Sequence, residues 1–464
     1  MSATPEIESE LRALVRMAKG SIADNVPFSE ITKLDLSDCG LDESFLKNEY
    51  AALLPNLSIL FLSHNHFTEI PAVIGLFPKL QMVAMKSNHL QSIHPDALQS
   101  PLRWLILTDN ALQQLPDTIG RCTQLQKLML SGNRLTSLPA ALSQHCTQLE
   151  LIRLATNQLI EPPLALLQQL PNLKWVALAN NPFLPQQQPQ QHPVLSHEPP
   201  VNVIEDEDLS SSEDGEVLGH GASGVTRKQF YQGQPVAVKT YHTTTVVTSD
   251  GRPQDERTIS MAVSQLNAGS ASRAFVRVLG QCRRTGALVM EYLENYVSLA
   301  DPPSFTSCTR DVYSGRPAWL SGRAAVHVVT VLLDALHQLH AHNIAHGDFY
   351  GHNILIQNNV DHYQKLNQVR VTDFGAAFFY DGTAEYAPWL GTIELRALAV
   401  LIAEVSTDLL LPNEEEDDEI AVKSHLAELV RACLREGATL EQVQVWWTQR
   451  RLREMATSFG VDSD

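Results

Sequence analysis

Three glycines and one lysine near the middle of the chain have the spacing of a phosphate-binding turn. Gly219, Gly221 and Gly224 form the pattern GxGxxG in VLGHGASGVT (217–226), and Lys239 lies fifteen residues after Gly224 in the alternating apolar segment QPVAVKTY. Glycines let a hairpin fold its backbone over phosphates, and a lysine on the next strand can reach the first two phosphates of ATP. The glycine pattern by itself is a weak signal, because a plain hairpin turn has the same composition.

Two later segments carry further polar side chains that could belong to a phosphate-binding site. IAHGDFYGHNIL (344–355) contains His346 and Asp348, with Asn353 five residues after Asp348, and RVTDFGAA (370–377) contains Asp373 followed by Phe and Gly. In this order and at these distances, the four motifs resemble those of the protein kinase fold, over roughly residues 213–455.

The resemblance implies a role for each polar residue. Asp373 would hold a magnesium ion that bridges the terminal phosphates, Asn353 would hold a second ion, and Asp348 would orient and deprotonate the attacking hydroxyl. Positioning and charge neutralisation supply nearly all of the catalysis in phosphoryl transfer. The resemblance therefore implies an ATP- and magnesium-dependent protein kinase that transfers the γ-phosphate to a protein hydroxyl, with serine or threonine favoured.

The same resemblance indicates where ATP would bind. Lys239 needs an anionic partner from the next helix; we expect Glu256, seventeen residues further on, with Asp255 as the alternative. The adenine is expected to stack between apolar side chains, with its edge on backbone groups of the hinge-like segment LVMEYL (288–293) and Met290 behind it. The expected ATP-binding residues are Leu218, Gly219, Gly221, Gly224, Val225, Thr226, Ala237, Lys239, Met290, Glu291, Leu293 and Leu355.

Several positions depart from the protein kinase pattern. Thr226 stands where the family usually has valine, Gly347 stands in place of the arginine of HRD, and Tyr350 stands where serine/threonine kinases carry a lysine that touches the transferred phosphate. Only eleven residues separate Gly375 from Ala387, which begins Ala-Pro-Trp, the nearest match to an APE motif. Set against the family resemblance, the short segment implies a reduced platform for a protein substrate, and Gly347 implies no control by loop phosphorylation.

These departures leave two alternatives open. The string HGDxxxxN also resembles the catalytic loop of small-molecule phosphotransferases related to aminoglycoside and choline kinases, which lack an activation segment. The chain could instead be a pseudokinase scaffold that binds nucleotide and a partner without transfer. The GxGxxG and VAVK pair favours a protein kinase over the first alternative. The presence of Lys239, Asp348, Asn353 and Asp373 together favours an enzyme over the second.

The first half of the chain contains an internal repeat. The frame LxxLxLxxN recurs at intervals of 22 to 24 residues, and an earlier copy, ITKLDLSDC (31–39), has Cys39 in the asparagine place. The frame resembles the leucine-rich repeat family over roughly residues 31–184. Each copy would supply a short strand to an arc of parallel strands, with its leucines in a shared core and its asparagine bonded to backbone groups of neighbouring turns. The frame asparagines are Asn65, Asn88, Asn110, Asn133, Asn157 and Asn181.

The positions between the leucines form the concave face of the predicted arc, since successive side chains of a strand point to opposite sides. This face is unusually apolar, which is typical of a surface that binds a protein or peptide. The alternative is that it packs against another segment or domain of the same chain. The expected partner-binding residues are Phe61, Met82, Trp104, Ile106, Met129, Arg153 and Trp175.

Composition bounds the remaining possibilities. A chain of 464 residues predicts two to four domains, and its net charge of −18 disfavours a nucleic-acid binder that neutralises phosphates. The N-terminal segment lacks the basic start and apolar run of a signal peptide, and no segment reads as a membrane span. The six cysteines are scattered without metal-type spacing. We therefore expect a cytoplasmic protein with free thiols.

The expected architecture is multi-domain, with an α/β leucine-rich repeat solenoid and an α+β bilobal kinase-like domain. A stretch rich in proline, glutamine and acidic residues separates the two and has too few apolar residues to form a core. The expected parts are an N-terminal helical cap (1–30), the repeats (31–184), a disordered linker (185–212), the kinase-like domain (213–455) and a C-terminal tail (456–464).

Overall fold

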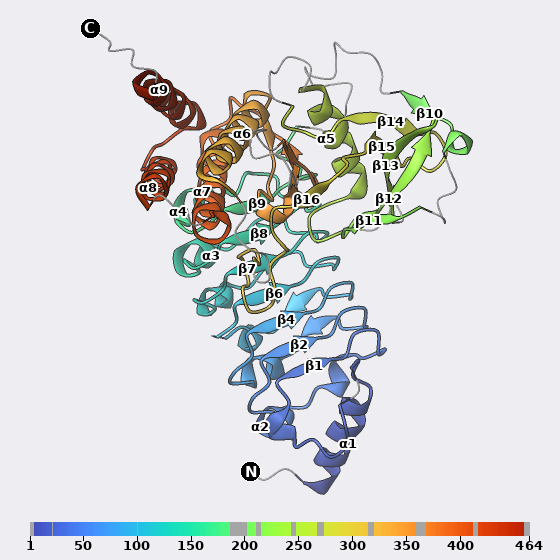
Figure 1. Cartoon of the computed structure of the whole chain (residues 1–464). Coiled ribbons are helices and arrows are strands. Elements are labelled where there is room, and N and C mark those ends of the chain that lie inside the picture. The colour runs from blue at the N-terminus through green and yellow to red at the C-terminus, as the bar shows by residue number, and fades with distance from the viewer. Residues whose placement is uncertain are drawn as a thin grey trace. The chain divides into compact units, whose positions relative to one another are not determined.

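The computed structural model describes residues 4–20, 22–99, 101–185, 202–209, 215–242, 247–266, 273–313, 320–357, 368–411 and 416–458. The chain divides into two compact units (Figure 1). The repeat unit comprises Met1–Leu184 together with Thr245–Arg252, and the second unit comprises Pro185–Thr244 and Pro253–Asp464.

The repeat unit is built on a sheet of seven parallel strands, which follow one another in chain order as predicted (Figure 1). Its strands are β1 (Lys33–Asp35), β2 (Ile59–Phe61), β4 (Met82–Ala84), β6 (Trp104–Ile106), β7 (Lys127–Met129), β8 (Leu151–Arg153) and β9 (Trp175–Ala177). A second, two-stranded sheet pairs β3 (Glu69–Ile70) with β5 (Ser92–Ile93).

The frame leucines and asparagines hold successive repeats together. Leu128, in the middle of β7, has no exposed surface, as expected for a leucine in a shared core. The Oδ1 of Asn157 accepts a hydrogen bond from the Leu135 N–H at 3.0 Å, and its Nδ2 donates to the carbonyls of Leu130 and Leu154 at 2.9 and 3.0 Å. Each such amide satisfies backbone groups of neighbouring turns that would otherwise be buried without a partner.

Short helices complete the repeat unit. Helix α1 (Pro5–Arg16) begins after Thr4, whose side chain accepts a hydrogen bond from the Ile7 N–H, and it buries Leu11 and Leu14 on one face. It lies where the sequence predicts a helical cap. The other helices of this unit are α2 (Tyr50–Leu53), α3 (Ala140–His145) and α4 (Leu164–Gln169).

The second unit begins with a six-stranded sheet in the order β10-β14-β15-β13-β12-β11 (Figure 1). All neighbours in it are antiparallel except β10 and β14. Its strands are β10 (Val203–Ile204), β11 (Val217–His220), β12 (Gly224–Tyr231), β13 (Gln234–Tyr241), β14 (Val278–Cys282) and β15 (Leu288–Glu291).

Strand β10 corrects part of the linker prediction. Residues 202–209 lie within the predicted linker 185–212, but β10 pairs with β14, and Ile204 packs into the sheet's core at 1% exposure. The carboxylate of Asp206 also accepts hydrogen bonds from the backbone of Arg284 and Thr285. The burial of Ile204 and the hydrogen bonds to Asp206 are enough to add a short edge strand. The average composition of the linker does not reveal so short a segment. The rest of the predicted linker, 186–201 and 210–212, lies outside the described residues.

The remainder of the second unit is mainly helical. It contains helices α5 to α9, a three-stranded sheet in the order β16-β18-β19, and the antiparallel pair β17 and β20. The helices are α5 (Pro253–Gln265), α6 (Gly322–Ala341), α7 (Ala387–Glu404), α8 (Glu416–Cys433) and α9 (Leu440–Ser458). The strands are β16 (Tyr296–Ser298), β17 (Ile344–Ala345), β18 (Ile354–Gln357), β19 (Val369–Val371) and β20 (Phe378–Phe379).

Helix α6 is the core helix of this part. Within the described ranges it alone has the length and apolar composition of a membrane span, yet 56% of that stretch is buried, and it packs against α7, α8 and α9. Its first turn is capped by Ser321, which accepts a hydrogen bond from the Ala324 N–H at 3.3 Å. Helix α9 extends to Ser458, so it includes the first three residues of the predicted tail (456–464), and 459–464 lie outside the described residues.

Candidate active site

The glycine-rich segment forms a tight turn between β11 and β12. The Gly221 N–H donates to the Gly224 carbonyl at 2.9 Å. A Cβ on Gly224 would lie 2.2 Å from the Thr240 carbonyl oxygen, whereas one on Gly219 would meet no atom within 4 Å. Gly224 is therefore required by the close approach of β12 to β13, while Gly219 leaves its side of the turn open. An open backbone of this kind is suited to phosphate oxygens.

Lys239 lies on β13 and forms an ion pair with Glu256 in the first turn of α5. The Lys239 side chain is 12% exposed and that of Glu256 is 3% exposed. Burial raises the pKa of Glu256, and the Lys239 ammonium opposes this by favouring the carboxylate. The pairing joins the sheet to α5 and gives the ammonium a defined position. Asp255, the alternative partner, is also buried in this turn.

Asn353 holds the carboxylate of Asp348. Its Nδ2 donates to both the backbone carbonyl and Oδ2 of Asp348, each at 2.9 Å. The backbone N–H and Oγ1 of Thr372 both donate to the Asn353 carbonyl at 2.9 Å. The predicted pair of residues is thus in contact, and Thr372 ties it to the segment that carries Asp373.

His346 is a structural histidine beside this pair. It has no exposed surface, and burial lowers its pKa, so the ring is neutral near pH 7. The hydrogen bonds assign the Nε2–H tautomer: Nε2 donates to the Thr372 carbonyl at 3.2 Å, and Nδ1 accepts from the Asp348 N–H at 3.3 Å. Its ring lies 5.1 Å from that of Phe374, centroid to centroid.

Asp373 occupies a left-handed backbone conformation, with φ of 55°. Such values are uncommon outside glycine and gather at functional sites. The side chain is exposed, and Oδ1 accepts a hydrogen bond from the Gly375 N–H at 3.1 Å. With the Asp373 carboxylate and the Asn353 amide oxygen, the donor set is the oxygen type that Mg²⁺ prefers, so these residues fit the ion. The described residues contain no group of three His, Cys, Asp or Glu side chains that could hold a metal.

Glu394 in α7 is a site residue that sequence reasoning missed. It is 3% exposed; Oε1 accepts the Gly347 N–H at 2.6 Å, and Oε2 lies 2.7 Å from His340 Nε2. These bonds outweigh burial and hold the pKa of Glu394 below its usual value. Gly347 has φ of 74°, a conformation that favours glycine, which gives a local reason for glycine at this position. The available signal was an acidic residue inside the apolar stretch TIELRALAVLIA.

A second buried network lies beside the catalytic loop and was also missed. Asp311 Oδ1 lies 2.7 Å from His352 Nδ1, and its Oδ2 accepts the His352 N–H at 3.2 Å. The Tyr313 hydroxyl donates to Glu404 Oε2 at 3.1 Å, and burial raises the pKa of Glu404 to about 8. No sequence signal pointed to Asp311, because it pairs with a residue about forty positions away.

The expected adenine-binding residues come from neighbouring strands. Thr226 lies opposite Lys239 in the β12–β13 pair, and Ala237 lies opposite Met290 in the β13–β15 pair. Leu218 on β11 is 41% exposed, and Val225 is half-buried next to Thr226. The others lie on different elements: Glu291 ends β15, Leu293 follows it, and the half-buried Leu355 is on β18 of the three-stranded sheet.

The activation segment is as short as the sequence predicts. Strand β20 pairs with β17 immediately before the catalytic loop, and α7 begins at Ala387, so the Ala-Pro-Trp match forms the first turn of a helix. Tyr350, in place of the usual lysine, is 4% exposed and its ring lies 5.1 Å from that of His352. The site therefore lacks a lysine at this position and has little chain in which to form a substrate platform.

The strand register places the expected concave-face residues in two rows. Phe61, Ile106, Met129 and Arg153 share one row, and Met82, Trp104 and Trp175 share the other. Three of the expected partner-binding residues are buried: Met82, Arg153 and Trp175 are 4%, 2% and 1% exposed, as the alternative of packing against the same chain requires. For Arg153 the cause lies inside the repeat unit, where it pairs with Asp250.

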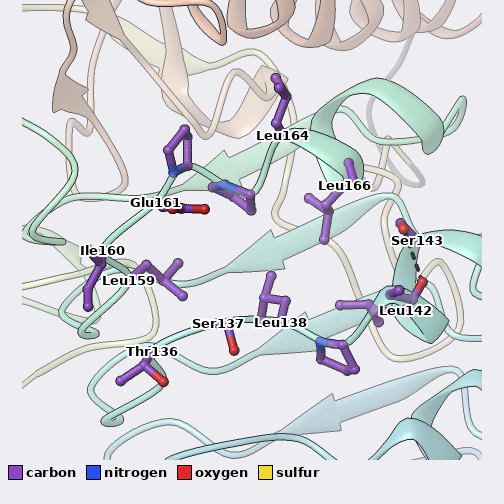
Figure 2. A pocket seen from close by; sticks show the side chains of 15 residues that line it. Thr136, Ser137, Leu138, Leu142, Ser143, Leu159, Ile160, Glu161, Leu164 and Leu166 are labelled. Carbon is purple, nitrogen blue, oxygen red and sulfur yellow. Dashed lines mark hydrogen bonds between the residues drawn. The ribbon is translucent and has the colours of Figure 1, made fainter.

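The repeat unit also has a hollow of about 540 Å³ between the segments that follow β7 and β8 (Figure 2). Figure 2 shows Leu138, Leu142 and Leu166 around it, and Glu161 is the charged residue of its lining. It has no lysine or glycine-rich turn, so its chemistry is not that of a nucleotide site.

Comparison with protein-family models gives two matches. The protein kinase domain model matches residues 212–408, and the leucine-rich repeat model matches 55–112, 78–135 and 123–183. Comparison with curated proteins gives no match. The chain is therefore a leucine-rich repeat protein with a protein kinase domain. The repeats, at 55–183, precede the kinase domain, at 212–408. The kinase domain implies ATP binding, and the repeats imply interaction with protein.

Proposed function

We propose that this chain is an active, magnesium-dependent protein kinase that transfers the γ-phosphate of ATP to a serine or threonine hydroxyl. The observation that carries the proposal is the buried ion pair between Lys239 and Glu256. Phosphoryl transfer in protein kinases requires this pair together with the metal-holding aspartate. A scaffold that only binds protein has no chemical need for a buried lysine held in this way.

Each polar side chain has a task in this proposal. Lys239 binds the first two phosphates of ATP, and Glu256 keeps its ammonium in place. Asp348, oriented by Asn353 Nδ2, positions the acceptor hydroxyl and takes its proton on the carboxylate. Asp373 and the Asn353 amide oxygen would hold Mg²⁺, which when bound neutralises charge on the terminal phosphates.

The repeats supply recognition in the same proposal. A short activation segment gives the kinase domain little surface with which to hold a protein substrate. We therefore assign selection of the protein partner or substrate to the repeat unit, whose concave face carries Phe61, Trp104, Ile106 and Met129 as partly exposed apolar side chains.

The test is Mg²⁺-dependent transfer from γ-labelled ATP by the full chain, with modified residues mapped by mass spectrometry. Asp348→Asn, Asp373→Asn and Lys239→Met should each lower transfer by about 100-fold or more. Asp381→Asn is the matched control, because among the contacts described the carboxylate of this exposed aspartate accepts hydrogen bonds only from Thr383. Absence of transfer by the wild type, with ATP binding retained, would overturn the proposal in favour of a nucleotide-binding scaffold.

Two observations favour a second candidate, a small-molecule hydroxyl phosphotransferase. Seven residues separate the end of β20 at Phe379 from the start of α7 at Ala387, which leaves little length for a peptide platform. Tyr350 replaces the lysine typical of serine/threonine kinases. The same labelled ATP, offered with a panel of amino alcohols and aminoglycosides, separates the two candidates. Label on a small molecule with none on protein would favour the second.

A further inference from the structure

A segment from the middle of the chain is bound by the repeats. Val247–Arg252, here called the docked turn, lies in sequence between β13 and α5 but belongs to the repeat unit. Asp250 Oδ1 pairs with Arg153 Nε at 3.0 Å, and the Arg153 side chain is 2% exposed. The Ser131 Oγ donates to the Ser249 carbonyl at 2.6 Å. The concave face at β7 and β8 thus already holds a peptide, which is part of this chain.

The docked turn has a compact internal structure. The Thr248 N–H and Oγ1 both donate to the Gly251 carbonyl, at 2.8 and 2.9 Å, and Oγ1 accepts from the N–H groups of Asp250 and Gly251 at 3.2 Å. Thr248 is 5% exposed. These bonds fix the backbone at Asp250, so less conformational entropy is lost when its carboxylate meets Arg153.

Gly132 shows that the repeat is shaped for this turn. In the other repeats, the residue before the frame asparagine also has positive φ but is never glycine: His64, Ser87, Asp109, Thr156 and Asn180. Backbone conformation therefore does not require glycine at this position. A Cβ on Gly132 would lie 2.9 Å from Val247 Cγ1, closer than packed carbons allow. The absent side chain leaves room for Val247.

The docked turn leads directly into the helix that carries Glu256. Arg252 is followed by Pro253, the first residue of α5, and Glu256 lies in the first turn of that helix. Proline restricts the backbone of the residue before it, so few free dihedral angles separate Asp250 from Glu256. A change in the position of the turn is therefore transmitted to the start of α5.

We propose that the repeats regulate phosphate transfer by holding this turn. The docked turn keeps the start of α5 where Glu256 can pair with Lys239, and a protein partner that presents a similar acidic turn to Arg153 displaces it and weakens the pair. This inference rests on the proposed function and deepens it, since it names the intramolecular ligand of the concave face and the helix that responds.

The test compares the full-length wild type with Gly132→Ser. Serine suits the backbone here, because Ser87 has positive φ at the same position of another repeat. Its Cβ should expel Val247. Amide hydrogen exchange over 253–265 should become about tenfold faster, and phosphate transfer should fall by about fivefold or more. Val247→Ala added to Gly132→Ser should restore both. The matched control, His64→Ser at an exposed position, should change neither.

Asp250→Asn probes the same contact from the turn, in case Gly132→Ser does not fold. A peptide of residues 246–253, added in excess, should speed exchange in α5 of the wild type more than the same peptide with asparagine for Asp250. Unchanged exchange in both variants overturns the inference. Faster exchange with unchanged transfer overturns it as well, because the turn then does not control the pair. A wild type without transfer defeats the proposed function, while the exchange data still decide whether the repeats hold α5.

Discussion

Glu394 links the catalytic loop to α7 through a single carboxylate. It accepts the Gly347 N–H and hydrogen-bonds His340, and nearly all of its surface is buried. A lost partner leaves buried polar groups unsatisfied, which costs more than the bond itself contributes. At the residue scale, the backbone conformation beside Asp348 therefore depends on a side chain from a distant helix.

We expect Glu394→Ala to lower the free energy of unfolding by about 3 kcal/mol. Chemical denaturation of the full chain measures the change. The control is Glu385→Ala, an exposed position just before α7, for which a change within about 0.5 kcal/mol is expected. Equal effects of the two variants would show that the Gly347 and His340 bonds do not support the loop.

Glu404 makes stability depend on pH. Burial, with Asp311 nearby, raises its pKa from 4.5 to about 8 in the folded protein. Between these values the folded chain keeps a proton that the unfolded chain has released, so its contribution to the free energy of unfolding falls as pH rises from 4.5 through about 8. The contribution is fully present below 4.5.

Glu404→Gln should remove this loss, because an amide does not ionise and its oxygen can still accept from the Tyr313 hydroxyl. The denaturation midpoint of the wild type should drop between pH 6 and pH 8 by more than that of the variant. Parallel pH profiles of the two proteins would show that Glu404 does not hold the proton.

At the scale of elements, the frame asparagines hold one repeat to the next. We expect Asn157→Ala to lower the free energy of unfolding of the repeat unit by about 3 kcal/mol, since it leaves the Leu135 N–H and two carbonyls without the amide. Hydrogen exchange in β7 to β9 should rise most, because a repeat contacts mainly its neighbours. The control is Asn172→Ala, at a half-buried position whose side chain bonds only the Thr147 carbonyl among the contacts described. Equal losses of unfolding free energy in the two variants would contradict the role of the frame asparagines in holding the repeats together.

At the scale of the whole molecule, nucleotide should stabilise one unit. A ligand at 100 times its Kd adds about 2.7 kcal/mol to the unit that binds it. Mg·ATP should therefore protect amides over 217–241 and 346–375 from exchange and leave those of β2 to β6 unchanged. Lys239→Met should abolish the protection, whereas Asn157→Ala should retain it. Protection confined to the repeat strands would place the nucleotide elsewhere.

Much of this protein could be predicted from spacing along the chain. The repeat frame predicted parallel strands in register, and the structure shows them from β1 to β9. The motifs around Lys239, Asp348 and Asp373 predicted a kinase-like domain, which the family comparison confirms. Such patterns can be seen in the sequence because each is a short run whose physical role depends on its own periodicity or order.

The sequence by itself determined the two folds, the order of the domains and the residue types available for phosphate chemistry. Only the tertiary structure decided that Glu394 holds Gly347, that Asp311 holds His352, and that Arg153 binds Asp250. These pairs join residues about forty to a hundred positions apart. A local pattern cannot identify which two residues pair, because the bond forms only once folding has brought the two segments together and excluded water from between them.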